Sequence, residues 1–347
     1  MNVTPSLIAA FQQQARACGE LGSPFMARLC TLFATRLRPD SALTRRLFDW
    51  QGDLGPGAVS VPLRLCGALH ALVLQGHAGL GAVYPPAAAD DGALWAALKA
   101  ALRDEADFIG AFIDSAPQTN EVRRSAALIA AGHWLTARLG LPIAMMELGA
   151  SAGLNLQWDR YALDIGAQRF GPAAPALVLR PEWRGDLPPA EAPQVISRAG
   201  VDLNPLDPND PGDGLRLLAY LWPDQPERLA LTRAAIAARP PRPERGDAIA
   251  WLRQRLAPTP GHLQLIYHTI AWQYFPAALQ AEGEALIAQA GLRASAEAPL
   301  AWLAYEGDGQ APGAALVLRL WPGDLRINLG RADFHGRWID WQAPPAR

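Results

Sequence analysis

Apolar residues recur at helical spacing through the first part of the chain, up to about residue 140. The apolar positions that carry this pattern include Ile8, Phe11 and Ala15, and further along Leu94, Leu98 and Leu102. Spacings of three and four residues place such side chains on one face of a helix. A last helix is predicted over 120–139, because Gly140 and Pro142 follow it as stop signals. We therefore expect residues 1–118 to form an N-terminal helical domain.

The pattern changes after Pro142, where short apolar runs alternate with longer helical segments. The apolar runs cover Ile143–Leu148, Val195–Asp202, 263–267, 300–305 and 315–320. The helical segments cover Leu154–Arg160, 213–238, 247–256 and 276–290. Strands that alternate with helices predict a parallel α/β sheet. A Pro-Gly-Asp turn and a second apolar run at 325–329 predict an antiparallel hairpin at the end of this sheet.

A proline-rich stretch at about 160–193 breaks the alternation and predicts an inserted hairpin or lid. The predicted second domain is therefore an α/β domain over 119–347 that carries this insertion. With 347 residues, of which 50% are hydrophobic and 18% charged, the chain is long enough for two domains with substantial cores.

The charge balance disfavours two classes of partner. The net charge is −2, from 31 basic and 33 acidic residues, so the chain has no excess of positive charge with which to bind nucleic acid or an anionic membrane. The chain has no apolar run of about 18 residues, and its first residues lack the features of a signal peptide. We expect a cytoplasmic protein with a small-molecule substrate.

The cysteines and histidines do not show the spacing of a metal site. The three cysteines, Cys18, Cys30 and Cys66, lie far apart, so we expect buried free thiols rather than disulfides. The six histidines form no H-x-x-x-H pattern, so we expect no bound metal.

The turn from Glu147 to Gly153 has three interpretations. It can be a cofactor-binding turn, because small residues let the backbone approach a ligand and an acidic residue can accept its hydrogen bonds. It can be a G-x-S-x-G nucleophile elbow with Ser151 as the nucleophile and His268 as the base. Asp202 or Asp247 would then complete the triad. It can also be a tight structural turn.

The order of elements favours the cofactor interpretation over the hydrolase. An α/β-hydrolase has strands and an oxyanion-forming glycine-rich loop before its nucleophile, whereas everything before Pro142 is predicted to be helical and lacks such a run. A nicotinamide enzyme is disfavoured because the turn lacks G-x-G-x-x-G.

Glu-x-Gly-x-x-x-Gly after the first predicted strand resembles the first motif of class I S-adenosylmethionine-dependent methyltransferases. The run 199–205 resembles the end of that superfamily's second strand, where an acidic residue binds the ribose, and 246–248 resembles the turn that reaches the adenine. The resemblance implies a Rossmann-like seven-stranded sheet that ends in an antiparallel hairpin. It also implies that S-adenosylmethionine is bound by Glu147, Gly149, Ala150, Ser151, Gly153, Asn155, Asp202 and Asp247.

The whole chain resembles an uncharacterised bacterial family, number 2332 among the domains of unknown function. The runs that carry this second resemblance are 120–125, 147–156 and 268–276.

Further polar and aromatic residues are predicted at the same site. Glu147, Asp202 and His268 each lie at the end of an apolar run, so they should converge at the carboxyl edge of the sheet. His268 and Gln273 are predicted to be catalytic, although a buried structural histidine is an equal alternative. The predicted substrate-binding residues are Asn120, Glu121, Arg124, Trp272 and Tyr274.

The short link at Gly140 predicts that the helix over 120–139 runs antiparallel to the first strand, so that its start returns to this edge. The leading function is methyl transfer to a small molecule, which works chiefly by positioning the acceptor. A serine hydrolase and a non-catalytic methyltransferase-like sensor or scaffold are the alternatives.

Overall fold

The computed structural model describes residues 6–55 and 57–346, which divide into two compact units. Within the described residues, the first unit runs to Thr119 and also includes Asp210–Ala230. The second unit comprises Asn120–Asn209 and Leu231 onwards. The chain thus leaves the first unit, enters the second, and returns once before the second is complete.

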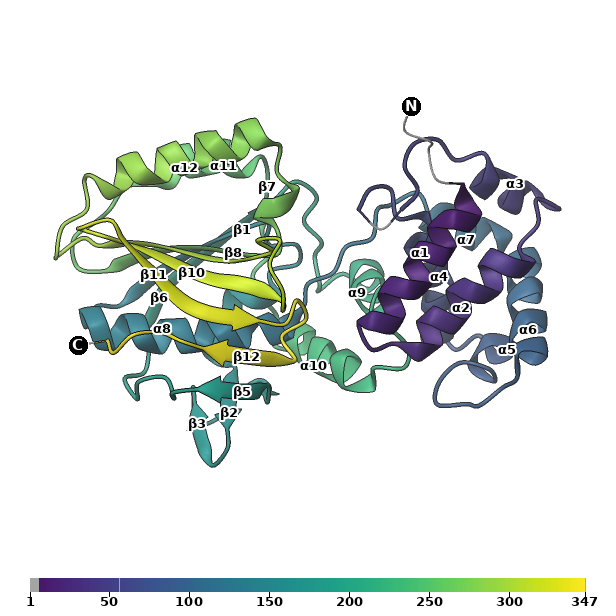
Figure 1. Ribbon diagram of the computed structural model, residues 1–347, viewed down its shortest axis with the longest axis horizontal. Helices are drawn as coiled ribbons and strands as arrows, with labels where there is room; N and C mark the ends of the chain where they lie inside the picture. Colours follow the sequence, from purple (N-terminus) through teal and green to yellow (C-terminus); the bar gives the residue numbers. More distant parts are fainter. Residues whose placement is uncertain (1–5, 56, 347) are drawn as a thin grey trace. The chain divides into compact units, whose positions relative to one another are not determined.

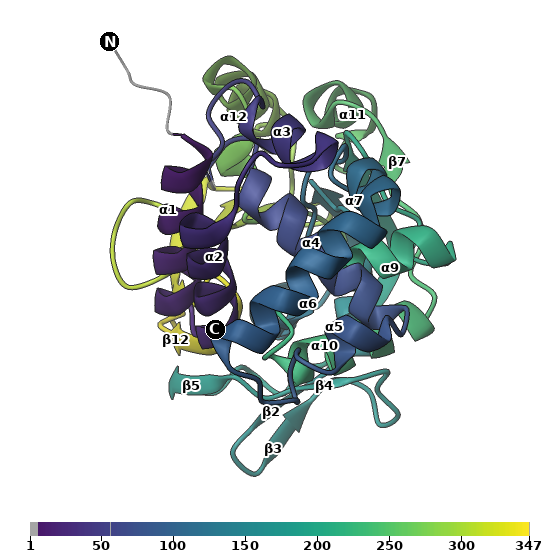
Figure 2. The ribbon, with the colours of Figure 1, turned by 90° about the vertical axis from the view of Figure 1, so that its right-hand side faces the viewer.

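The described elements of the first unit are helices, several of which begin at a serine cap. They are α1 (Leu7–Glu20), α2 (Pro24–Arg36), α3 (Ala42–Phe48), α4 (Val61–Leu74), α5 (Ala78–Gly81), α6 (Asp91–Asp104), α7 (Ala106–Phe112) and α9 (Pro211–Ala219). The side chains of Ser6, Ser23 and Ser41 accept hydrogen bonds from the first turns of α1, α2 and α3. Figure 2 shows α1 and α2 lying side by side.

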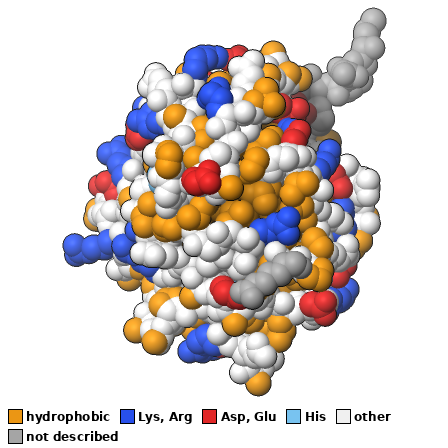
Figure 3. Space-filling model, turned by 90° about the vertical axis from the view of Figure 1, so that its left-hand side faces the viewer, with side chains coloured by type: hydrophobic (Ala, Val, Ile, Leu, Met, Phe, Trp, Pro, Cys, Tyr) orange, Lys and Arg blue, Asp and Glu red, His pale blue; other side chains and the backbone are white. Residues whose placement is uncertain are grey.

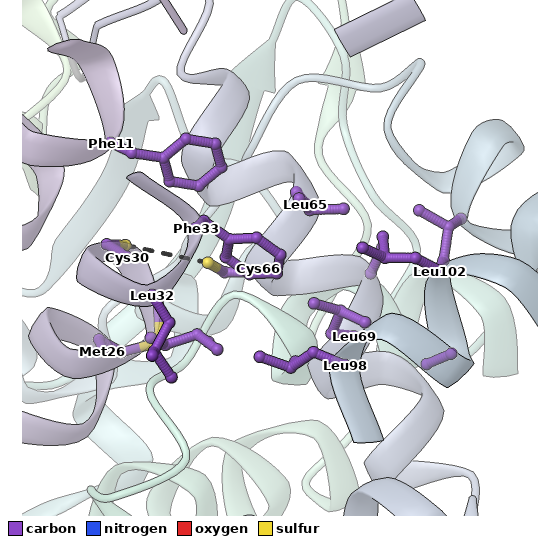
Figure 4. Close-up of a cluster of buried hydrophobic side chains, with 14 of the residues drawn as sticks. Phe11, Met26, Cys30, Leu32, Phe33, Leu65, Cys66, Leu69, Leu98 and Leu102 are labelled. Carbon is purple, nitrogen blue, oxygen red and sulfur yellow. Dashed lines mark hydrogen bonds between the residues drawn. The ribbon is translucent and has the colours of Figure 1, made fainter. Parts of the chain in front are cut away.

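A hydrophobic core joins these helices and includes the three thiols. Figure 4 shows Cys30 of α2 facing Cys66 of α4, with 4.0 Å between the sulfur atoms, among Phe33, Leu65 and Leu69. All three cysteines are free and buried, which confirms the prediction for them.

The segment 210–230 packs within this helical core, whereas the sequence analysis placed it in the sheet domain. A Cβ atom at Gly67 of α4 would lie 2.6 Å from the Tyr220 ring, so α4 and the end of α9 are in close contact. The predicted helix over 213–238 is also broken, because Pro223 lies between α9 and α10 (Pro226–Ala237).

The second unit is built on a mixed sheet of nine strands, not the seven predicted. The strand order is β5-β12-β11-β10-β9-β8-β1-β6-β7. The bounds are β1 (Ile143–Leu148), β5 (Glu182–Gly185), β6 (Val195–Asp202), β7 (Glu244–Arg245), β8 (Leu263–Thr269), β9 (Leu300–Glu306), β10 (Ala314–Trp321), β11 (Leu325–Ala332) and β12 (Trp338–Trp341). Strands β7, β6, β1, β8 and β9 are parallel to one another, and β9, β10, β11 and β12 pair antiparallel in turn. The predicted β10–β11 hairpin is confirmed.

Strand β1 lies at the topological switch point of the sheet. The strands that follow it in the chain, β6 and β7, are added on one side, and β8 and β9 are added on the other. Its neighbours are β6 on one side and β8 on the other. In open α/β sheets, ligands bind outside the carboxyl ends of the strands at such a point. The residues after β1, β6 and β8 are therefore the candidates for ligand binding.

Helices cover both faces of this sheet (Figure 1). Helices α11 (Ala248–Arg255) and α12 (Ala277–Gly291) pack on one face. The other face carries η1 (Val122–Arg124), α8 (Ser125–Leu139) and η2 (Leu154–Arg160), and the short helix η3 (Trp272–Tyr274) follows β8. On the end of the second unit that Figure 3 shows, hydrophobic side chains gather in a patch, with basic and acidic side chains around it.

The predicted insertion contains short strands. Strands β2 (Ala162–Ile165), β3 (Gln168–Phe170) and β4 (Val178–Leu179) form a separate sheet of three strands. Strand β5, at the end of the insertion, pairs in parallel with β12 and extends the large sheet by one edge strand.

Candidate functional site

The turn after β1 is held against the end of β6. Gly149, Ser151 and Gly153 have positive φ values of 69°, 54° and 73°. The N–H groups of Gly149 and Ala150 both donate to the Val201 carbonyl at 3.0 Å. The backbone of this turn is thereby fixed by the neighbouring strand.

The glycines of the turn allow close packing of protein against protein. A Cβ at Gly149 would lie 2.6 Å from the Ala271 Cβ, and one at Gly153 would lie 2.4 Å from the Pro241 carbonyl oxygen. Separations this short are not tolerated. The cofactor interpretation expects these glycines to make room for a ligand, but the space beside them is taken by other loops of the chain, as in a tight structural turn.

Glu147 is a buried acid at the end of β1. Only 1% of its surface is exposed, and its Oε2 has no hydrogen-bond partner among the described residues. Burial raises its pKa well above the ordinary value of 4.5, and the Asp202 charge raises it further. The Tyr267 hydroxyl and the Arg124 guanidinium act in the opposite direction. Glu147 is therefore an acid that the chain leaves largely uncompensated.

Ser151 and Asp202 meet at the same edge. The Ser151 N–H donates to Asp202 Oδ2, and the Asn204 N–H donates to Asp202 Oδ1, both at 2.8 Å. The Ser151 Oγ is buried and has no partner within the described part of the chain. A carboxylate retains further lone pairs after accepting two hydrogen bonds, so Asp202 can still accept from a ligand hydroxyl.

Two asparagines predicted to contact a ligand instead join segments of the second unit. The Leu154 N–H at the start of η2 donates to Asn120 Oδ1 at 2.8 Å. Ser125 Oγ donates to Asn155 Oδ1 at 2.7 Å, deep in the interior. Asn120 and Asn155 are both buried, and these bonds tie the start of α8 to the segment after the β1 turn.

The start of α8 reaches the carboxyl end of β8. Arg124 donates through Nη1 to the Thr269 carbonyl and through Nε to the Phe334 carbonyl, both at 2.9 Å. These contacts agree with the predicted antiparallel course of this helix relative to β1. Glu121 accepts from the N–H and Nε of Arg123 at 3.2 Å and is buried.

His268 is fully buried, and both of its ring nitrogens are engaged. The Trp302 indole N–H, which can only donate, lies 2.9 Å from Nε2, so this nitrogen is the unprotonated acceptor. Nδ1 then carries the proton and donates to Glu306 Oε1 at 2.7 Å. Trp272 stacks on the ring at 5.0 Å between centroids. In this arrangement His268 has no free nitrogen for proton exchange with a ligand, contrary to its predicted catalytic role.

Glu306, which the sequence analysis missed, organises the loop after β8. Its Oε1 accepts from the N–H groups of Ala271 and Trp272 at 2.9 and 3.0 Å, in addition to His268. Burial alone would raise its pKa, but the bonds from His268 and these two N–H groups outweigh burial and lower it. The one sequence signal was an acid directly at the end of the apolar run 300–305.

The remaining predicted residues, Gln273, Trp272, Tyr274 and Asp247, have different surroundings. Gln273 accepts from the Gly307 N–H at 3.2 Å and so links the loop to β9, which is a structural role. Of the two aromatic residues predicted to bind substrate, Trp272 lies in the core of the sheet and Tyr274 is 69% exposed. Asp247 caps α11 by accepting from the N–H groups of Ile249 and Ala250.

Two features are absent from the part of the chain that the structure describes. None of the described His, Cys, Asp and Glu side chains gather in threes as a metal site would require. No described helix combines the length and apolar character needed to cross a bilayer.

Comparisons with known proteins place the chain in a family. No curated protein and no solved structure matches it significantly. The model of one family, described as an uncharacterized protein conserved in bacteria, matches residues 8–341. That span covers nearly the whole chain, including the turn after β1 and the Glu306 region. The chain therefore belongs to this family, DUF2332.

Proposed function

We propose that this protein binds S-adenosylmethionine at the carboxyl end of β1 and that it is a methyltransferase acting on a small molecule. The observation that carries the proposal is the buried Glu147 carboxyl, whose Oε2 lacks a partner among the described residues. A buried polar atom without a partner costs free energy, so a ligand group that pairs with it is favoured there. The buried Ser151 hydroxyl, on the turn that follows Glu147, also lacks a hydrogen-bond partner among the described residues.

The strand order supports a Rossmann-like description of the sheet. Taken in chain order, β1, β6, β7, β8 and β9 have the spatial order of the first five strands of a doubly wound dinucleotide-binding sheet. We propose that the methyltransferase-type sheet corresponds to these strands plus the β10–β11 hairpin. Strands β12 and β5 are then additions at one edge.

The residues present fit the cofactor. Glu147 would accept from its ammonium group, Ser151 would bond to it through the hydroxyl, and Asp202 would accept from its ribose hydroxyls. Bound S-adenosylmethionine supplies an electrophilic methyl group on a positively charged sulfur. The residues of the chain would then hold the methyl acceptor in line with the methyl–sulfur bond and exclude water. Glu306 and His268 serve as positioning residues, since they fix the loop that contacts Gly149 through Ala271.

A serine hydrolase is the second candidate, because Ser151 combines a φ of 54° with an unpartnered hydroxyl, as expected at a nucleophile elbow. Its proposed base, His268, is instead bound on both sides by Glu306 and Trp302. Asp202 and Asp247 accept from backbone N–H groups rather than from a histidine. We therefore rank the hydrolase below the methyltransferase.

Ligand binding to the purified protein tests the proposal. A ligand at one hundred times its dissociation constant stabilises a protein by about 2.7 kcal/mol, which is visible as a melting shift. We expect S-adenosylmethionine and its demethylated product to produce this shift, and Glu147→Ala and the isosteric Glu147→Gln to abolish it. Glu20→Gln, on the exposed end of α1, is the matched control and should keep it.

Three results would redirect the proposal. A folded protein that shows no shift with millimolar ligand would contradict cofactor binding. Fluorophosphonate labelling that is lost in Ser151→Gly would favour the hydrolase. Binding without transfer of a labelled methyl group to any component of a bacterial small-molecule extract would favour a non-catalytic sensor or scaffold.

A further inference from the structure

A second region of the sheet has the features of a ligand site. A cavity of about 230 Å³ lies over β9, β10 and β11, on the face that α12 partly covers. It is smaller than the pockets that take drug-sized ligands, so its occupant must be small. None of its lining residues belongs to the β1 turn, so the inference does not depend on the proposed cofactor.

The floor of the cavity is apolar, with the small side chains of Ala304, Ala315 and Val317 beside the larger Trp302. Ala304 of β9 lies directly opposite Val317 of β10, and Ala315 lies opposite Glu306. Small side chains on neighbouring strands leave open volume above the sheet. The middle of the cavity therefore suits a short hydrocarbon body.

Two arginines stand at one wall. Arg319 of β10 and Arg326 of β11 are direct partners in the antiparallel register, and both line the cavity. Like charges placed directly opposite each other destabilise a strand pair. Asp324 compensates Arg319 at 2.7 Å, but no described residue forms an ion pair or hydrogen bond with the guanidinium of the exposed Arg326. This wall retains a free guanidinium, which suits a carboxylate.

The acids of the cavity differ in how far they are compensated. Asp308 is bound by two nitrogens of Arg331 at 2.8 and 3.0 Å, and this pairing holds its pKa at about 2. Glu306 is occupied by His268 and the loop. Glu284 of α12 is exposed and has no partner among the described residues. The cavity thus has one free acid on its helix side and one free base on its strand side.

We propose that this cavity binds a small zwitterion, with its carboxylate on Arg326, its ammonium group on Glu284 and an apolar body over Ala304 and Val317. Arg326 stands on β11, whereas Glu284 stands on α12, which packs against β9, so the two charges lie on different sides of the apolar floor. An ω-amino acid with a short methylene chain has this charge pattern. Opposite charges on opposite walls favour a ligand that satisfies both over one that satisfies either alone.

Titration of the full chain with three probes, followed by saturation-transfer NMR, tests the proposal. The probes are 6-aminohexanoate, hexanoate, which lacks the amine, and hexylamine, which lacks the carboxylate. We expect 6-aminohexanoate to bind at least about tenfold more tightly than either of the others. Arg326→Gln should reduce its affinity to that of hexylamine, and Glu284→Gln should reduce it to that of hexanoate.

Both substituted side chains are exposed, so the variants should fold, and urea melts verify this. Arg233→Gln, an exposed arginine of α10 away from the cavity, is the matched control and should bind like the wild type. Equal affinity of the wild type for 6-aminohexanoate and hexanoate would overturn the proposal. Unchanged binding in both Arg326→Gln and Glu284→Gln, or the lack of saturable binding up to about 10 mM, would also overturn it.

Discussion

Glu147 and Glu306 stand near the carboxyl ends of two parallel strands of one sheet, β1 and β9, and they differ in their hydrogen-bond partners. Glu306 accepts from His268 and from two loop N–H groups, and its pKa is lowered despite burial. Glu147 keeps an unpartnered oxygen, and its pKa is raised. Burial is common to both, so the hydrogen bonds decide the direction of the shift.

Glu306 serves the fold, whereas Glu147 is the acid that we propose binds a ligand. The bonds of Glu306 hold the loop that carries Ala271, and Ala271 in turn packs on Gly149 of the β1 turn. Glu306 therefore supports the turn beside which Glu147 is left uncompensated. A site of this kind needs both types of acid, because a ligand group must be free to bind while its surroundings stay fixed.

The largest expected effect comes from removing Glu306. Glu306→Ala leaves the Nδ1–H of His268 and the N–H groups of Ala271 and Trp272 without an acceptor. Because these are hydrogen bonds to a charged group, their loss should lower the free energy of unfolding by about 2–4 kcal/mol. Urea denaturation measures this loss. Glu306→Gln keeps an acceptor oxygen and should lose clearly less. Equal stability of Glu306→Ala and the wild type would show that the loop is held by other contacts.

Glu147 should instead make stability fall as the pH rises. Its folded-state pKa lies above the unfolded value, so its contribution is complete below about pH 4.5 and is lost as the pH rises through the folded pKa. Between the two pKa values, the wild type should lose about 1.4 kcal/mol per pH unit relative to Glu147→Gln. Urea melts of both proteins over a pH series measure this difference. Parallel pH profiles would show that Glu147 ionises in the fold as it does in the unfolded chain.

Glu306 should show the reverse dependence. Because its folded-state pKa is lowered, its contribution is present above the unfolded value and is lost as the pH falls through the folded pKa. The same pH series applied to Glu306→Gln separates the two acids.

The smallest expected effect concerns Ser151. Its φ of 54° is a left-handed conformation that glycine adopts more easily, so Ser151→Gly should change stability by less than about 1 kcal/mol. If Ser151 is a turn residue that also bonds to the cofactor, binding should weaken only modestly. Complete loss of S-adenosylmethionine binding in Ser151→Gly would give the hydroxyl a larger part than Glu147 in holding the ligand.

Local patterns were sufficient to predict much of the fold. The apolar runs at Ile143–Leu148 and Val195–Asp202 are both strands. Strand β1 is buried along nearly its whole length, as expected for a central parallel strand, whereas β6 is fully buried only near its carboxyl end. Strand β7 has two residues and β12 has four, too few to form a periodic pattern. The nine-stranded sheet could therefore not be counted from the sequence.

The contacts within the site could be predicted less well, because they depend on residues distant in sequence. Glu147 and Asp202 were predicted to converge at the carboxyl edge of the sheet, and these two do come together near the β1 turn. The state of His268 depends on Trp302 and Glu306, more than thirty positions away, and no local pattern encodes such a pairing.

The pairing of β5 with β12 has a consequence for the order in which the protein is assembled. Strand β5 emerges about 150 residues before the strand that it pairs with. At ribosomal speeds of about 5–20 residues per second, the segment Glu182–Gly185 waits for roughly 8–30 s with its partner not yet made. The insertion can therefore dock onto the large sheet only after β12 (Trp338–Trp341) has been made.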